Sequence, residues 1–156
     1  MIYIKYRNMK IYADIEGAKV NGGTIPPEIV TTVQRPDLVI IDNSTSPASV
    51  ILVELTIPFT RNIAGANARK RERYEFLASD IESAGYKCTN LSLEICSRGH
   101  LNARNRETVI HICHMLKIRK FQQVIKTCSK LALLGSYTIF NSRSEATWSG
   151  SGYLKP

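Results

Sequence analysis

The sequence predicts an α/β fold with a central mixed β-sheet flanked by helices. Three observations lead to this prediction. Short or alternating apolar runs, typical of strands, occupy the first third of the chain. A stretch with helical spacing follows, and one more strand-like run then precedes two further helical stretches. The order strands, helix, strand, helices is typical of a sheet that is covered by helices.

The first strand is predicted at Met9–Ile15, where every second residue is apolar. Glycines and Pro26-Pro27 follow it and forbid a helix immediately afterwards. We expect Ile29–Val33 to begin a second extended segment.

Two further strands are predicted to form a hairpin. Leu38–Ile41 is a short apolar run of the kind found in a strand that is covered on both faces. Residues 42–47 have the composition of a turn, and Val50–Ile57 forms the next strand until Pro58 stops it.

Helical spacing begins at about Asn67 and continues to Ala84, with Gly85 placed as a C-terminal cap. Four residues of this stretch fall on one stripe: Lys70, Tyr74, Leu77 and Ile81. This stripe predicts a helix with one buried face and a lysine near its beginning.

The rest of the chain predicts a strand and two helices. Leu91–Cys96 alternates like a strand and ends at Arg98-Gly99. Helices are expected at 102–116 and 121–134, where Gly135 would end the second one. A short edge strand is expected around Tyr137–Phe140.

Length and composition predict one domain over residues 1–148, followed by a flexible tail at 149–156. The chain has no run of about 20 apolar residues, so we expect an intracellular protein that is neither secreted nor embedded in a membrane. The four cysteines form no C-x-x-C pair and are expected to be reduced. His111, Cys113 and His114 are expected to be ordinary helix residues rather than metal ligands.

Two acidic residues interrupt the apolar hairpin. Asp37 stands at the entrance to the first strand, and Glu54 lies within the second. Burying a carboxylate costs several kcal/mol unless it is paired or binds a metal. The two carboxylates and the Leu55 backbone carbonyl would form an oxygen-only site suited to Mg²⁺ or Mn²⁺. The alternative is a pair of solvated strand-end acids that form surface salt bridges, for example with Arg35.

The order of these motifs resembles that of the PD-(D/E)xK restriction-like endonucleases. The resemblance rests on Arg-Pro-Asp at 35–37, the apolar hairpin, Glu-Leu-Thr at 54–56, and Lys70 and Tyr74 on the next helix. It is greatest to the endonuclease domain of site-specific non-LTR retrotransposons, and it covers roughly residues 9–100. The resemblance implies a restriction-endonuclease-like core and a Mg²⁺-dependent endodeoxyribonuclease of mobile-element origin, nuclear if the element is eukaryotic.

The resemblance also implies catalytic roles for Asp37, Glu54, Lys70 and Tyr74. One departure from the family is Thr56, which occupies the position where the family usually has lysine. Lys70 is the candidate replacement, because its stripe should turn it toward the sheet. If Lys70 is instead a solvated charge, the domain would be a catalytically inactive nucleic-acid-binding module that retains the fold.

Other residues are weaker candidates for the same site. Asp14 is the best placed further metal ligand, with Glu16 and Glu28 as competitors. The net charge of +8 attracts polyanions, and double-stranded DNA is the expected partner. A homodimer and attachment to a larger retroelement protein both agree with this prediction. The residues expected to contact DNA are basic and flank the site: Arg35, Arg61, Arg69, Arg71, Arg73 and Arg98.

Overall fold

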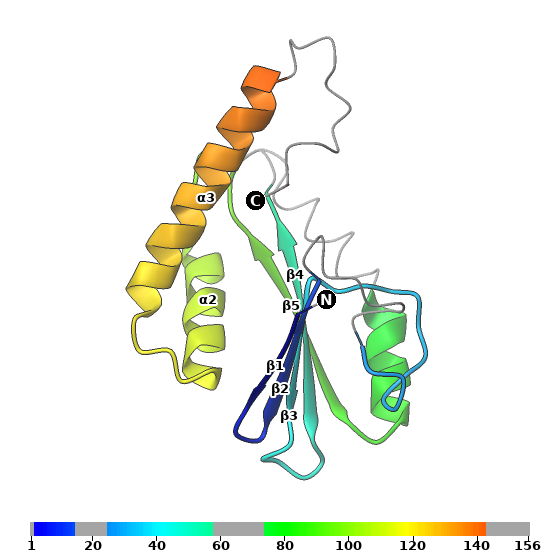
Figure 1. Ribbon diagram of the computed structural model, residues 1–156. Helices are drawn as coiled ribbons and strands as arrows, with labels where there is room; N and C mark the ends of the chain where they lie inside the picture. The colour runs from blue at the N-terminus through cyan, green and yellow to red at the C-terminus, as the bar shows by residue number, and fades with distance from the viewer. Residues whose placement is uncertain (1, 15–24, 58–73, 143–156) are drawn as a thin grey trace. The chain divides into compact units, whose positions relative to one another are not determined.

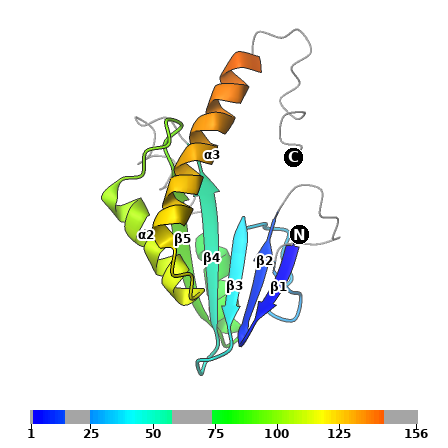
Figure 2. The same cartoon turned by 60° about the vertical axis from the view of Figure 1, so that its left-hand side comes forward.

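The computed structural model describes residues 2–14, 25–57 and 74–142. Their strands form one five-stranded sheet in the order β1-β2-β3-β4-β5 (Figures 1 and 2). The residues divide into two compact units, one within 1–55 and 67–92 and the other within 56–66 and 93–156. The prediction of one domain over 1–148 stays a prediction, and the tail at 149–156 lies outside the described residues.

The sheet begins with two antiparallel strands, β1 (Ile2–Tyr6) and β2 (Met9–Ala13). Arg7 turns the chain between them with a φ of 53°. The rings of Tyr3 and Tyr12 lie opposite each other with their centroids 5.0 Å apart. The sequence predicted β2 but missed β1, in which apolar and polar residues do not alternate.

The predicted hairpin is confirmed as β3 (Leu38–Asp42) and β4 (Ser49–Thr56), which are antiparallel. In the connecting turn, Asp42 accepts hydrogen bonds from the backbone and the hydroxyl of Ser44. The extended segment expected at Ile29–Val33 is wrong. Residues 27–29 form a turn in which the Ile29 N–H donates to the Pro26 carbonyl, and the structure assigns no strand between 25 and 37.

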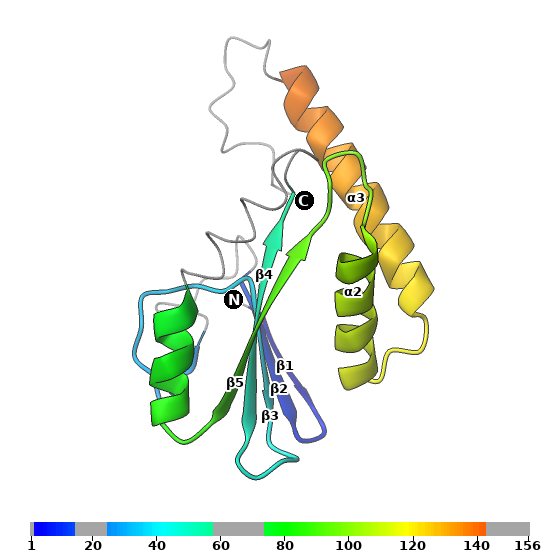
Figure 3. The ribbon, with the colours of Figure 1, turned by 180° about the vertical axis from the view of Figure 1, so that it is seen from behind.

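β5 (Lys87–Glu94) begins four residues earlier than predicted and pairs with β4. The Lys87 N–H donates to the Ala48 carbonyl and the Ile95 N–H to the Thr56 carbonyl, so residue numbers rise together along the two strands. β5 is therefore parallel to β4, as Figure 3 also shows, and the predicted mixed sheet is confirmed. A parallel neighbour requires a crossover, and a helix supplies it.

The described part of that helix spans residues 74–83 and ends at Gly85, whose φ of +90° fits the predicted cap. Tyr74, Leu77 and Ile81 are each at most 2% exposed and pack on one face of the sheet. The sheet contributes Val39, Ile41, Val50 and Leu52 to the same core. The predicted helical stripe is confirmed from Tyr74 onward, and Lys70 lies outside the described residues.

The second unit is built on α2 (Ala103–Met115) and α3 (Phe121–Ser142), which lie side by side (Figures 1 and 3). Asn102 caps α2 by accepting a hydrogen bond from the Asn105 N–H. Val109 and Cys113 of α2 pack with Ala132 of α3. No helix among the described residues has both the length and the apolar character needed to cross a membrane.

α3 is longer than predicted. It passes through Gly135 without a break, and the edge strand expected at Tyr137–Phe140 is wrong because these residues are helical. A glycine inside a helix costs only about 1 kcal/mol relative to alanine, and good helix formers precede it. Thr138 also bonds back to the Leu134 carbonyl within the helix.

Gly99 allows a test of the packing in the second unit. Its φ is +77°, and a Cβ added there would lie 2.5 Å from the Ser129 carbonyl oxygen of α3. At Gly85, φ is also positive but nothing lies within 4 Å of an added Cβ. Gly99→Ala should therefore lower the free energy of unfolding, measured in urea, clearly more than Gly85→Ala, whose cost is about 1–2 kcal/mol of backbone strain. Equal losses would contradict the close contact.

Candidate functional site

The register of the sheet brings three acidic residues into one row. Leu38 pairs with Val53, so the next step of the β3–β4 register sets Asp37 opposite Glu54. Ala13 pairs with Leu38, so the same step of the β2–β3 register sets Asp14 opposite Asp37. The Asp14 N–H donates to the Asp37 carbonyl at 2.9 Å, which extends the ladder by this one step.

The three carboxylates lie on the face of the sheet that packs against the helix. Side chains alternate along a strand, so Glu54 shares its face with Leu52 and Asp37 shares its face with Val39. Both apolar residues belong to the core around the helix. Asp14 follows two residues after Tyr12, which packs against the same core. The row is therefore the edge of the apolar core.

Glu54 is the most deeply buried of the three acids, with 6% of its surface exposed. The Tyr74 hydroxyl donates to its Oε2 at 3.0 Å and lies 3.3 Å from the Arg35 carbonyl. Tyr74 itself is 2% exposed. A hydrogen bond to a charged acceptor is worth about 1.5–3 kcal/mol, so the phenol contributes to holding this carboxylate in the core.

Asp37 is held by the neighbouring strand. The Leu55 N–H donates to its Oδ2 at 2.7 Å. The Thr56 carbonyl faces β5, and successive backbone groups of a strand point to opposite edges, so the Leu55 carbonyl faces the edge of β4 where Asp37 lies. The Leu55 side chain is 48% exposed, on the opposite face from Glu54.

Asp14 and Arg35 form an ion pair. Arg35 Nη2 lies 2.7 Å from Asp14 Oδ1, and the side chains are 53% and 25% exposed, respectively. Asp14 is thus paired with a cationic side chain, whereas the sequence analysis expected it to be a further metal ligand. Arg35 is exposed enough to meet a polyanion, but part of its charge is already compensated by Asp14.

The remaining sequence-predicted residues fall into two groups. Arg98 is exposed and belongs to the second unit. Five others lie outside the described residues, so their roles stay predictions: Arg61, Arg69, Lys70, Arg71 and Arg73. Of the competing acids, Glu28 is exposed and Glu16 is also outside the described residues.

A metal ion would fit the chemistry of the row. Asp37 and Glu54 provide two carboxylates, and the backbone of Leu55 adds a carbonyl oxygen, which is the donor set that Mg²⁺ or Mn²⁺ prefers. Within 2–14, 25–57 and 74–142, no three His, Cys, Asp or Glu side chains come close enough to hold a metal ion by themselves. The candidate is therefore a pair of carboxylates completed by backbone oxygen.

Sequence reasoning missed a buried polar link in the second unit. Glu94 is 2% and Asn105 1% exposed, and the Glu94 N–H donates to Asn105 Oδ1 at 3.0 Å. This bond ties the end of β5 to the first turn of α2. The alternation of Leu91–Cys96 suggested a polar outer face for Glu94, but Leu93 through Cys96 are all buried. An alternating pattern does not reveal that this end of the strand is covered on both faces.

The described cysteines behave as expected for buried thiols. All four are free, and Cys96 and Cys113 are fully buried. Burial raises the pKa of Cys88 to about 11 and raises the pKa values of Cys113 and Cys128 above their ordinary value. These three thiols stay protonated at neutral pH, which makes them poor nucleophiles and poor metal ligands.

Comparison with protein-family models, with curated proteins and with solved structures finds no match to this chain. The function is therefore inferred from the residues of the site.

The hydrogen bond between Tyr74 and Glu54 gives a direct test of this arrangement. Tyr74→Phe should lower the free energy of unfolding by about 1–3 kcal/mol, because the buried Glu54 carboxylate loses a donor. The loss should shrink when Glu54 is already glutamine, and a double-mutant cycle measures the difference. Tyr86→Phe is the matched control, since the Tyr86 hydroxyl makes no hydrogen bond to any described residue. A cycle without coupling would mean that the two groups do not interact.

Proposed function

We propose that this chain is a divalent-metal-dependent endonuclease domain that hydrolyses phosphodiester bonds of DNA, with a restriction-endonuclease-like core. The observation that carries the proposal is the pair of Asp37 and Glu54, set opposite each other by the β3–β4 register at the edge of the core. Paired carboxylates at such a place cost stability, and a bound cation would offset that cost. The same two residues carry the motif resemblance.

Each residue has a distinct part in the proposed reaction. Asp37 and Glu54 would hold Mg²⁺ or Mn²⁺, together with the Leu55 carbonyl. The bound ion would supply an activated water and stabilise charge on the scissile phosphate. The Leu55 N–H keeps the Asp37 carboxylate in place, and the Tyr74 hydroxyl does the same for Glu54. Tyr74 is thus a positioning residue in this proposal, although the family resemblance implied a catalytic role for it.

The mixed sheet with a crossover helix between β4 and β5 supports the proposal at the level of architecture. The resemblance requires an apolar hairpin that carries both acids and then a helix that carries Lys70 and Tyr74. The hairpin and the Tyr74 end of the helix are present in that order. A mobile-element origin and the catalytic role of Lys70 remain part of the proposal and rest on the sequence motifs.

The second candidate function is a nucleic-acid-binding module without catalysis, and Thr56 favours it. Thr56 lies two residues beyond Glu54 on the same face of β4, where the family usually has lysine. Its Oγ1 is buried and makes no hydrogen bond within the part of the chain that the structure describes. A hydroxyl cannot supply the missing positive charge, so catalysis depends on a cation from elsewhere.

Cleavage of supercoiled plasmid tests the proposal. With Mg²⁺ or Mn²⁺ the parent chain should produce nicked or linear DNA, and a chelator should prevent this. Asp37→Asn and Glu54→Gln should each reduce the rate by roughly 10²-fold or more while the chain stays folded. Asp80→Asn and Glu82→Gln are the matched controls, because these exposed acids lie on the 74–83 helix. Full cleavage by either site variant would remove the assigned site, and plasmid retardation without cutting by the parent would favour the binding module.

A further inference from the structure

A large part of the positive charge of the chain lies in residues 95–142, where the nuclease prediction uses only Arg98. Residues 95–142 contain eight lysines and arginines and a single acid, Glu107, so their net charge is +7. The described residues before 95 contain nine acids and five bases. A segment of this charge attracts polyanions, so α2 and α3 offer a second surface for nucleic acid, apart from the nuclease site.

α3 has a second stripe on the side away from its packed face. Phe121, Ile125, Cys128 and Ala132 pack into the core of the second unit. Five other residues follow one another at intervals of four and three, which places them on one helical stripe: Lys126, Lys130, Leu133, Tyr137 and Phe140. All five are exposed, and Tyr137 and Phe140 are 64% and 70% exposed.

We propose that this α3 stripe binds single-stranded nucleic acid. The ammonium groups of Lys126 and Lys130 would contact phosphates, and the rings of Tyr137 and Phe140 would stack against bases. A positive surface followed by exposed aromatic rings is the usual combination for single strands, because unpaired bases offer their faces to a ring. In a duplex these faces are already stacked. The stripe spans about 21 Å from Lys126 to Phe140, which is the length of a few nucleotides.

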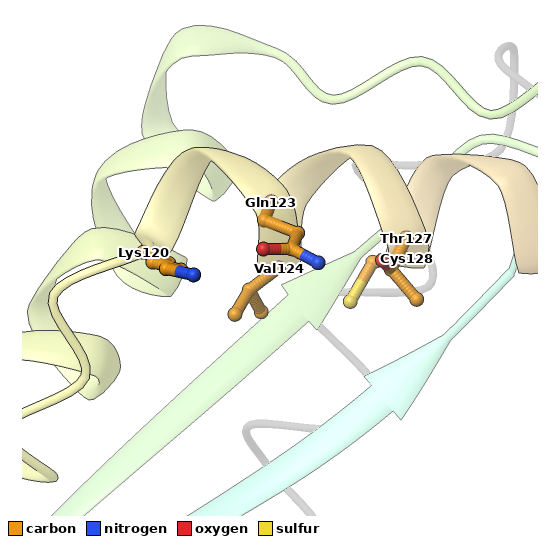
Figure 4. A pocket seen from close by; sticks show the side chains of 5 residues that line it. All are labelled: Lys120, Gln123, Val124, Thr127 and Cys128. Atoms are coloured by element: carbon orange, nitrogen blue, oxygen red, sulfur yellow. The ribbon is translucent and has the colours of Figure 1, made fainter.

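A hollow beside the stripe fits the same ligand. It has a volume of about 280 Å³ and is lined by Lys120, which precedes α3, and by four residues of α3 that Figure 4 labels: Gln123, Val124, Thr127 and Cys128. The surface that lines the hollow is almost entirely apolar, and Val124 and Cys128 form part of its wall. Burial raises the pKa of Cys128, so this wall stays uncharged at neutral pH. Such an apolar hollow suits the flat face of a nucleobase.

Charge decides between this ligand and other occupants of the stripe. A second copy of the chain would bring another +7 segment against the first. An apolar protein partner would bury the two lysines without compensating charge, which is costly. A single strand supplies phosphates for the lysines and bases for the rings at the same time.

Fluorescence anisotropy with labelled oligothymidylate tests the proposal on the full chain. A chelator is present throughout, so failure of binding here is distinguishable from failure of cleavage above. The parent should bind the single strand more tightly than a duplex of equal length. Lys126→Gln with Lys130→Gln should weaken binding and lower the slope against log salt concentration by about 1.4, or roughly 0.7 for each phosphate contact. Tyr137→Ala with Phe140→Ala should weaken binding about tenfold or more and leave the slope unchanged.

The charge-matched control is Lys5→Gln with Lys87→Gln, which removes two exposed lysines from the sheet and should leave binding nearly unchanged. Far-UV circular dichroism establishes that each variant is folded. Equal affinity of the parent and both stripe variants for oligothymidylate would overturn the proposal. Two other results would overturn it. One is that Tyr137→Ala with Phe140→Ala dissociates a dimer of the parent in sedimentation without losing affinity for oligothymidylate. The other is that the parent binds phosphatidylserine vesicles and no oligonucleotide.

Discussion

The pairing of β3 with β4 determines which side chains the candidate site contains. Leu38 opposite Val53 sets Asp37 opposite Glu54 and turns both toward the helix. A slip of β4 by one residue would move every side chain of that strand to the other face, so that Leu52 would leave the core together with Glu54. The same apolar packing that stabilises the hairpin therefore fixes the position of the carboxylates. Site and core cannot vary independently.

This arrangement carries a cost that packing alone does not explain. Val50 and Leu52 are fully buried, and a sheet built only for stability would continue this face with another apolar residue. Glu54 stands there instead, and Tyr74 uses its hydroxyl on this carboxylate at the edge of the core. Buried polar groups that contradict the surrounding pattern are typical of functional sites, where stability is given up for chemistry. At one end of the row, Asp14 forms a salt bridge with Arg35, which is the alternative to a metal site that the sequence left open. Asp14 is more exposed than Glu54.

Much of the fold followed from local patterns. The hairpin and the helix stripe were predictable because apolar periodicity distinguishes strands from helices. The helix ends at Asn102 and Gly85 were predictable because each cap is determined by residues next to it in the sequence. The opposition of Asp37 and Glu54 also followed, since a hairpin with a short turn leaves few registers. β1 was missed because apolar and polar residues do not alternate in Ile2–Tyr6, although isoleucine and tyrosine are good strand formers. The length of α3 was missed because a single glycine inside a helix costs only about 1 kcal/mol and does not end it. The buried Glu94–Asn105 link depends on contacts between segments that a single sequence does not display.

Thermal unfolding with and without Mn²⁺ tests whether Asp37 and Glu54 form a cation site. This test does not depend on cleavage. A ligand that binds only the folded chain stabilises it by about 2.7 kcal/mol at 100 times its Kd. If Asp37 and Glu54 form such a site, Mn²⁺ should raise the Tm of the parent in a concentration-dependent manner. Asp37→Asn should abolish this increase and, with repulsion between neighbouring carboxylates relieved, should leave the metal-free chain at least as stable as the parent. An equal increase in Tm for the parent and Asp37→Asn would contradict the claim, because the ion would then bind elsewhere.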